Sequence, residues 1–418
     1  MDTPNQQPKR RWRSLFVLAF GQICDNTEGG LVNILFPVIR QSLGLGVDAL
    51  GILSSISKFA RMIFGPIWSL AADRFGRKRI LFIITGVWGI WTIAAGCAQN
   101  FTQLLILYGI GAIGTVAGEP ITNSLLADLF KENERGKAFG AIRSMASAGS
   151  LVLTPLIGQL SDIQDGWRLG LMTMGGVSVL SGVLILLFLV EPERPSASQS
   201  EEMPKFKWTD IRLLLKTPSF LLLAGMLPFV TSLVLFSFFV TYFVDVRGWK
   251  NSEAALLYAV FQGGWTVSSL LGGLIGDWFE KRMGPNGRVA LMQIYLVSFS
   301  ALSYGLLQID WGRGFAMYGF SFLFGLAGSV GFSGAVLPMV CAIVPSRLSA
   351  TAFSLLFSLV QGFLSAILTL AFGKIAMNIG LEATMLWMVT IPYACNAVYW
   401  CLFYRFYPSD CRRNAASA

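Results

Sequence analysis

Two related stretches decide the fold: "SLAADRFGRKR" (residues 69–79) and "GLIGDWFEKR" (residues 273–282). Each comes at the end of a long apolar run and places an Asp, then an aromatic residue, then basic residues. About half of the chain separates the two stretches. A motif that returns at such a distance is typical of an internal duplication, so we expect two related halves.

The composition places the chain in a membrane. Of its 418 residues, 54% are hydrophobic and only 13% are charged, which leaves too little polar surface for a soluble protein of this length. The apolar runs are continuous rather than alternating, which favours helices over barrel strands. Because about 20 apolar residues span a bilayer as helix, we predict twelve transmembrane helices, at about residues 15–39, 47–70, 80–98, 102–128, 137–159, 168–190, 219–244, 253–276, 288–308, 314–341, 348–377 and 383–405.

The basic residues indicate the orientation. Lys and Arg gather in the N-terminal segment and in alternate loops, and the positive-inside rule then places both termini in the cytoplasm. The apolar run after the N-terminal segment is too long for a signal peptide, so we expect the segment to be retained. We therefore predict a multi-pass protein of the plasma or inner membrane. Membrane topology explains the formal charge of +9, and nucleic-acid binding is not expected.

The sequence lacks the residues that several kinds of chemistry require. Histidine is absent, the six cysteines have no paired or metal-ligand spacing, and no Gly-rich loop followed by Lys-Ser or Lys-Thr is present. We expect no disulfide, structural metal, cofactor or ATP-driven step. We also expect no enzyme, because no nucleophile and base form a recognisable constellation.

One long polar stretch divides the chain. Residues 191–217 are rich in Pro, Ser and Glu and indicate a flexible cytoplasmic linker, with a short surface helix over Trp208–Leu215. This linker separates a first six-helix bundle, residues 1–190, from a second bundle with a short tail, residues 218–418.

The stretch "GPIWSLAADRFGRKR" (residues 65–79) resembles the loop signature of the major facilitator superfamily. The matching residues are Asp73, Arg74, Gly76, Arg77 and Lys78 in the first half, and Gly273, Gly276 and Asp277 in the second. Ser69 and Ala71 depart from the pattern, and the second copy lacks the later Gly and the full basic run. The resemblance implies an all-α fold of two pseudo-symmetric six-helix bundles that transports by alternating access.

By the same resemblance, Asp73, Arg74, Gly76, Arg77, Lys78, Gly273 and Asp277 form a gating motif at the cytoplasmic side. The alternative is that the basic residues only anchor the topology. That alternative explains the charges but not the Asp and Gly at fixed spacing, nor the second copy.

Charged residues interrupt the first spans. Asp25 and Glu28 lie three residues apart near the middle of the first span, so they share a helix face. Lys58 and Arg61 repeat this spacing in the second span with opposite sign. Glu119 and Arg143 complete a set of three acids and three bases. Such residues either pair statically or line a water-filled cavity, and the nearby amides of Asn26, Asn33 and Asn123 favour the cavity.

The second half carries aromatic and small residues in place of these charges. Phe261, Gln262, Trp265 and Phe332 are candidates for an apolar cavity wall, although aromatic stripes more often serve packing. A charged half beside an apolar half predicts a small amphipathic or organic anionic substrate, bound in part by Lys58, Arg61 and Arg143.

Proton coupling needs a carboxylate that gains and loses a basic partner during the cycle. The candidates are Asp25, Glu28 and Glu119, with Lys58 or Arg61 as the partner of an anionic group. We expect a monomer in the lipid bilayer that moves its substrate together with, or in exchange for, protons.

Two further resemblances bear on direction and substrate. The fifth span resembles the superfamily's antiporter signature at Gly140, Gly149, Pro155 and Gly158, but Thr154 and Gln159 depart from it. This favours export, while uptake of an organic anion by symport stays open. "AGEPITNSLLADLF" (117–130) and "LFPVIRQSLGL" (35–45) are similar to the Spinster-type branch, which is associated with lysophospholipid and sphingolipid movement. A membrane receptor that does not transport is the alternative of another class.

Overall fold

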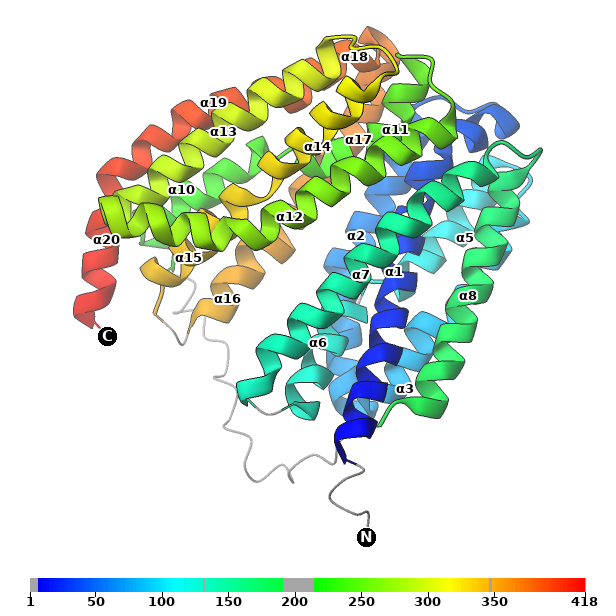
Figure 1. The fold of residues 1–418 in the computed structure, drawn as a ribbon, viewed down its shortest axis with the longest axis horizontal. Helices are drawn as coiled ribbons and strands as arrows, with labels where there is room; N and C mark the ends of the chain where they lie inside the picture. Colours follow the sequence, from blue (N-terminus) through cyan, green and yellow to red (C-terminus); the bar gives the residue numbers. More distant parts are fainter. Residues whose placement is uncertain (1–6, 117, 131, 191–213, 346–347, 418) are drawn as a thin grey trace. The chain divides into compact units, whose positions relative to one another are not determined.

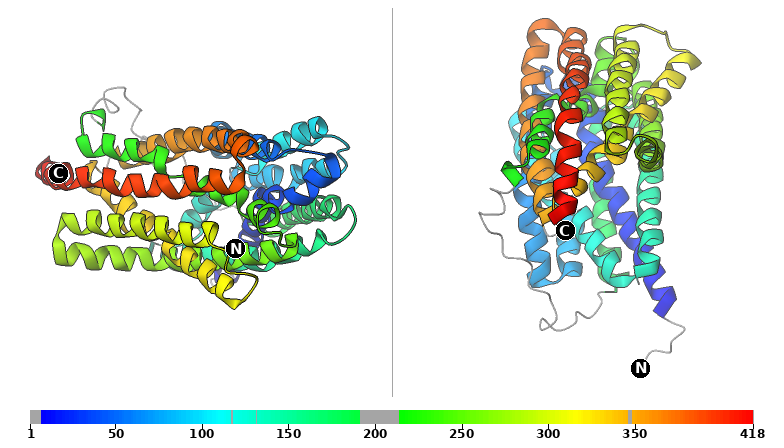
Figure 2. Two further views of the ribbon diagram at one scale, coloured as in Figure 1. Left: turned by 90° about the horizontal axis from the view of Figure 1, so that it is seen from above. Right: turned by 90° about the vertical axis from the view of Figure 1, so that its left-hand side faces the viewer.

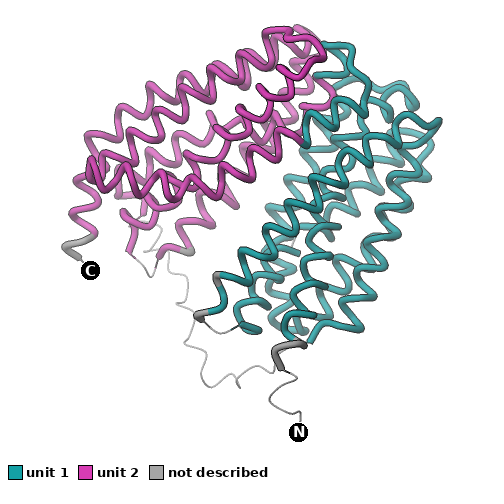
Figure 3. Tube along the Cα trace, in the orientation of Figure 1, with its two compact units in different colours: residues 1–199, 243–259 teal, residues 200–242, 260–418 magenta. Residues whose placement is uncertain are grey.

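The computed structural model describes residues 7–116, 118–130, 132–190, 214–345 and 348–417. Within these ranges the regular secondary structure is helical and contains no strand, which confirms the prediction of an all-α chain. The chain divides into two compact units, residues 1–199 with 243–259 and residues 200–242 with 260–418 (Figure 3).

The first unit contains helices α1, α2, α6 and α7, labelled in Figure 1, on which the candidates Asp25, Arg61, Glu119 and Arg143 lie. Its elements are α1 (Gln7–Leu43), α2 (Asp48–Phe75), α3 (Arg77–Leu81), the π-helical η1 (Phe82–Val87), α4 (Gly89–Gly96), α5 (Phe101–Gly114), α6 (Gly118–Leu129), α7 (Glu132–Leu160) and α8 (Gly166–Phe188). Helix α2 ends at Gly76, whose φ of 99° favours glycine over residues that carry a Cβ.

The second unit is built in the same way. Its elements are α10 (Pro218–Met226), η3 (Leu227–Phe229), α11 (Ser232–Asp245), α12 (Asn251–Met283), α13 (Pro285–Gln308), α14 (Phe315–Gly328), η4 (Phe332–Val336), α15 (Leu337–Ile343), α16 (Ser349–Phe353), η6 (Ser354–Val360), α17 (Gln361–Ile379), α18 (Leu381–Met385), η7 (Leu386–Thr390), α19 (Ile391–Tyr399), η8 (Trp400–Leu402) and α20 (Phe403–Ser417). Helices α13 and α19 run side by side, as Figures 1 and 2 show.

The end of α11 and the start of α12 belong to the first unit. There Arg40 of α1 pairs with Asp245, and the Ser252 hydroxyl donates to Asp162 at 3.4 Å. The contact-defined units therefore differ from a division at the linker alone. Most of the predicted linker and of its surface helix, Trp208–Leu215, lies outside the described residues.

The predicted spans all correspond to helical segments. Eleven helical segments of the described chain are long and apolar enough to cross a membrane. The first predicted span, residues 15–39, lies in helix α1 and is not among these eleven. Helix α1 is 37 residues long, and Asp25, Asn26 and Glu28 lower its apolar character. The last predicted span ends at 405, whereas the helix continues to Ser417 as α20. The extension is polar, so apolar periodicity does not reveal it.

Glycines let helices of the first unit approach closely. A Cβ at Gly86 in η1 would lie 2.7 Å from the Cα of Gly182 in α8, and a Cβ at Gly175 of α8 would lie 2.6 Å from the carbonyl oxygen of Gly89 in α4. Small residues at such crossings allow the backbone contact that holds membrane helices together. This packing fixes α4 and α8 against each other.

Helix α20 closes two helix ends of the second unit. The buried Asp410 carboxylate accepts a hydrogen bond from the Ser219 backbone N–H, in the first turn of α10, at 2.9 Å. The Asn414 amide donates to the carbonyls of Ala342 and Val344, at the end of α15, at 3.0 and 3.3 Å. The side chains thus satisfy backbone groups that helix termini leave unpaired.

We predict that Asp410→Ala and Asn414→Ala each destabilise the protein by about 1–2 kcal/mol, because each leaves helix-end groups unpaired. Thermal unfolding of the purified chain in detergent measures the effect as a lower Tm. Arg412→Ala is the matched control, because Arg412 is an exposed residue of the same helix. Equal melting temperatures for the three variants would contradict the capping role.

Candidate functional site

Asp25 is the central residue of α1 and lies against two other elements. The Thr85 hydroxyl, on the π-helical η1, donates to Asp25 Oδ2 at 3.3 Å. A Cβ at Gly118, the first residue of α6, would overlap the Asp25 carboxylate, so this glycine makes room for it. Asp25 Oδ1 is buried and has no hydrogen-bond partner among the described residues. One carboxylate oxygen is therefore available for a proton or a ligand.

An exposed charged face surrounds Asp25. Arg61, the middle residue of α2, is exposed. Glu119, next to Gly118, pairs with Arg143 of α7 at 3.5 Å, and the two side chains are 48% and 72% exposed. Asn26 is exposed beside Asp25. We call Asn26, Arg61, Glu119 and Arg143 the charged face.

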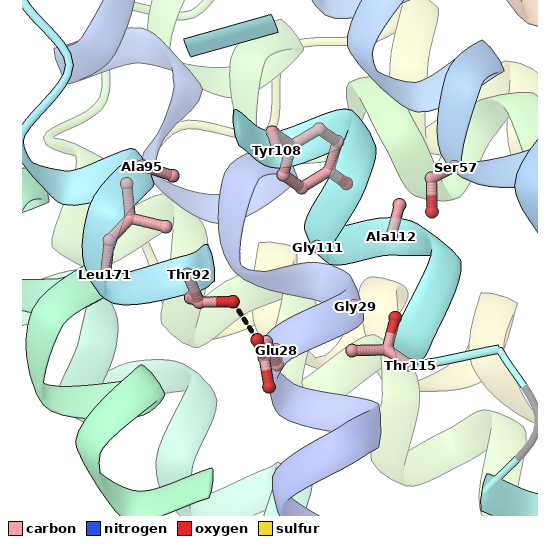
Figure 4. Close-up of a pocket in the computed structure, with 10 residues that line it drawn as sticks. All are labelled: Glu28, Gly29, Ser57, Thr92, Ala95, Tyr108, Gly111, Ala112, Thr115 and Leu171. Carbon is pink, nitrogen blue, oxygen red and sulfur yellow. Dashed lines mark hydrogen bonds between the residues drawn. The ribbon is translucent and has the colours of Figure 1, made fainter. Parts of the chain in front are cut away.

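Glu28 lies one turn from Asp25 but in a different setting. It is only 6% exposed. Its Oε1 accepts a hydrogen bond from the Thr92 hydroxyl of α4, and its Oε2 accepts one from the Ser178 hydroxyl of α8 at 2.7 Å (Figure 4 shows the first). Among the ion pairs of the described residues, none joins Asp25 or Glu28 to Arg61. The acid pair and the base pair seen in the sequence are therefore not matched one to one.

A cavity with a mixed polar and apolar lining lies beside Glu28. Its empty space is about 350 Å³ when the part open to solvent is included. Ser57 of α2, Tyr108 of α5 and Thr115 line it together with Glu28 and Thr92, as Figure 4 shows. Five oxygen-bearing side chains thus line one space, whose other lining residues are Gly29, Ala95, Gly111, Ala112 and Leu171.

The remaining polar candidates of the first unit occupy less exposed positions. Asn33 accepts a hydrogen bond from the Ser54 hydroxyl of α2 at 2.8 Å. Asn123 on α6 and Lys58 on α2 are partly buried. Asn33 therefore joins α1 to α2.

Of the aromatic candidates of the second unit, some belong to the hydrophobic core and one lines a pocket. Phe261 is completely buried and stacks on Phe239, with ring centroids 5.3 Å apart, so it belongs to the core. Trp265 packs edge-on against Phe236 at 4.9 Å, and Gln262 beside it is partly buried. Phe332, which is 38% exposed, lines a pocket of about 340 Å³ inside the second unit, together with Tyr295, Tyr393, Met292 and Gln361.

Comparison with known families identifies the chain. A profile of the Major Facilitator Superfamily matches residues 18–369, which is most of its length. The chain belongs to the Major Facilitator Superfamily. The expectations of a transporter-type fold and of a multi-pass membrane protein are thereby confirmed.

Relatives within the Major Facilitator Superfamily share low identity with this chain. The chain is 25% identical over 212 residues to "Protein spinster homolog 1" of Bos taurus, covering 49% of the chain and 40% of the bovine protein. It is 26% identical over 282 residues to the "Probable sulfoacetate transporter" of Cupriavidus necator, covering 64% and 65%. It is 23% identical to the hexuronate transporter of Bacillus subtilis over 68% of each chain. The chain thus matches 40% and 65% of the length of the first two proteins.

Solved structures of the Major Facilitator Superfamily share the fold. A bacterial homologue of the human lysosomal transporter Spinster, in an inward-facing and occupied conformation, aligns with a TM-score of 0.77 and 20% identity over 95% of this chain and 97% of that one. A D-xylose-proton symporter aligns with a TM-score of 0.73 and 15% identity over 94% and 97%. The relatives named for an activity are transporters rather than enzymes, as expected.

The superfamily's loop signature makes contacts inside the first unit. Arg77 pairs with Asp128 of α6 and with Asp73, the latter at 3.4 Å. Arg74 is exposed over the Phe75 ring, and Lys78 is partly buried. Gly76 supplies the positive φ that lets α3 start directly after α2. The signature therefore joins α2, α3 and α6.

The second copy of the signature is anchored differently. Arg288 of α13 pairs with Asp277 at 2.9 Å and with Glu280 at 2.5 Å, and it donates to the Gly334 carbonyl at 2.7 Å. Gly276 packs on the Gly334 backbone, whereas Gly273 faces open space. An arginine from the next helix thus replaces the basic residue missing from the motif.

Sequence reasoning missed the hydroxyl residues of the site. Thr85, Thr92, Tyr108 and Ser178 come from four separate helical segments. No fixed spacing links them to Asp25 or Glu28, and Ser and Thr are common in membrane helices. Only the folded packing brings them together.

Proposed function

We propose that this chain is a monomeric secondary active transporter that moves a small organic anion by alternating access, coupled to protons. The charged face at the middle of the spans carries the proposal. Exposed charges at this depth are too costly to contact lipid, so they must line a water-accessible path. A path with an ionised arginine at its centre is suited to an anionic cargo.

The chemistry of the charged face supports an anion. Arg61 and Arg143 are exposed, and a guanidinium binds a carboxylate, sulfonate or phosphate group with two parallel hydrogen bonds. Glu119 already occupies Arg143 at 3.5 Å. An incoming anion therefore competes with Glu119 for Arg143, and Glu119 is released when the substrate binds.

The named relatives agree with this substrate class. Sulfoacetate and hexuronates, the substrates in the names of two relatives, are small organic anions. The apolar pocket of the second unit supports a cargo that also has an apolar part, as a lysolipid has. The shared feature is one anionic group, with an apolar portion that varies.

Asp25 is our candidate for the proton site. It lies beside Gly118, the residue before Glu119 of the charged face, and its Oδ1 has no hydrogen-bond partner among the described residues. Glu119 is the second candidate for the proton site, because it loses its ion pair with Arg143 when the substrate binds that arginine. The partial antiporter signature of α7 supports export in exchange for protons, whereas the organic-anion relatives suit symport equally well. The direction of the pH gradient that drives transport distinguishes antiport from symport.

We further propose that the loop signature acts as a gate. Arg77 holds α3 to α6 through Asp128, and Arg288 holds Asp277 in the second unit. Releasing either arginine would free the helix ends that must move during alternating access.

The test uses proteoliposomes with a pH gradient of either polarity. Glucuronate, sulfoacetate and an anionic lysophospholipid serve as labelled probes. We expect one class to be moved under one polarity, and Arg61→Gln and Arg143→Gln to raise the KM for it, because each removes an anion contact. Arg313→Gln, an exposed arginine outside the face, is the control. Binding of a probe without flux under either polarity would show a receptor and contradict the proposal.

A further inference from the structure

The cavity beside Glu28 is separate from the charged face. Glu28 is 6% exposed, whereas Glu119 is 48% exposed. The Glu28 oxygens face the hydroxyls of Thr92 on α4 and Ser178 on α8. The cavity extends toward Ser57 of α2 and Tyr108 of α5, as Figure 4 shows. The cavity disfavours a substrate anion, because its lining among the described residues includes the Glu28 carboxylate and no basic side chain.

The hydrogen bonds of Glu28 suit its ionised form. Hydroxyls donate to both of its oxygens, and such charge-assisted bonds stabilise an anion. Burial opposes a bare charge unless a positive group compensates it. Among the ion pairs of the described residues, none includes Glu28. A bound cation would satisfy both requirements.

The donors around the cavity define the kind of cation. Thr92 and Ser178 keep oxygen lone pairs while they donate to Glu28, and Ser57, Tyr108 and Thr115 add three hydroxyl oxygens. Hard cations prefer such all-oxygen sites, and divalent ions usually gather several carboxylates or N and S ligands. Within the described ranges, no group of three or more His, Cys, Asp and Glu could hold a metal ion. A donor set of one carboxylate and several neutral hydroxyl oxygens carries one negative charge, which suits a monovalent cation.

We propose that Glu28, Thr92 and Ser178, with the hydroxyls of the adjoining cavity, bind one sodium ion. The proposal rests on packing inside the first unit alone and stands whether or not the chain carries an organic anion. Its consequence for the protein is a cation that ties α1 to α4 and α8 at the middle of the membrane.

The test measures binding without transport. Thermal unfolding of the purified chain in detergent is followed at constant ionic strength, in NaCl, KCl or choline chloride. Binding of radioactive sodium to the detergent-solubilised protein is measured directly as well. We expect NaCl to raise the Tm of the wild type in a saturable manner. Glu28→Gln and Thr92→Val should abolish or weaken this rise, because each removes a ligand oxygen while keeping the side-chain size.

Two variants guard against unfolding as the explanation. Thr92→Ser keeps the hydroxyl and should retain the sodium response, and Glu119→Gln changes an exposed acid outside the cavity and should leave it intact. An equal Tm rise in KCl or choline chloride, or an unchanged sodium response in folded Glu28→Gln, would overturn the proposal. Loss of anion flux in the Arg61 variant with an intact sodium response separates this site from the transport site.

Discussion

Proteoliposomes containing Asp25→Asn are expected to lose transport driven by a pH gradient, down to the level of empty liposomes, and to retain exchange of labelled for unlabelled substrate. Asparagine has nearly the shape of aspartate and still fits beside Gly118 and Thr85. It cannot take up or release a proton. The substitution therefore separates the proton step from the movement of the substrate.

The control for Asp25→Asn is Asp48→Asn, at the first residue of α2 and far from the charged face. This variant should keep both gradient-driven transport and exchange. Full gradient-driven transport by Asp25→Asn would exclude Asp25 as the proton site and leave Glu119 as the candidate. Loss of exchange as well as of driven transport would instead assign Asp25 to substrate binding.

Gly175→Ala is expected to destabilise the protein by about 1–3 kcal/mol, the usual cost of overpacking. The added Cβ would lie 2.6 Å from the Gly89 carbonyl oxygen and 2.8 Å from the Ile93 backbone nitrogen. Both are backbone atoms of α4, so neither can move without shifting the helix. The measurement is the Tm in detergent together with the yield of monodisperse protein.

The neighbouring Gly176 is the matched control. A Cβ there would meet nothing within 4 Å. Gly176→Ala should therefore raise stability by up to about 1 kcal/mol, because alanine favours helix over glycine. If both variants melted at the same temperature, the contact of α4 with α8 would not depend on glycine.

The sequence predicts the helices well and the pairing of charges poorly. Long apolar runs dictate membrane helices because the bilayer requires internal hydrogen bonding, and the Asp73 and Asp277 motifs indicate the superfamily. Spacing along a helix, however, says only that Asp25 and Glu28 share a face. It does not say which other helices that face contacts, so the hydrogen bonds from Thr92 and Ser178 to Glu28 could not be predicted.

The same limit applies to aromatic residues and to cation sites. Phe261 and Phe332 look alike in sequence, yet one is core and the other lines a pocket, because burial depends on the packing of α12, α14 and η4. Cysteine and histidine spacing predicts no structural metal. A site built from one carboxylate and scattered hydroxyls leaves no such spacing, so this prediction does not extend to sodium.

The caps supplied by α20 also set an order of events during synthesis. The N-terminus of α10 and the C-terminus of α15 receive their partners from Asp410 and Asn414, which the ribosome adds long after both helices. Chains usually fold unit by unit as they emerge. Nascent α10 and α15 therefore keep unpaired end groups until α20 is made, and insertion factors or proteases can act on them during that interval.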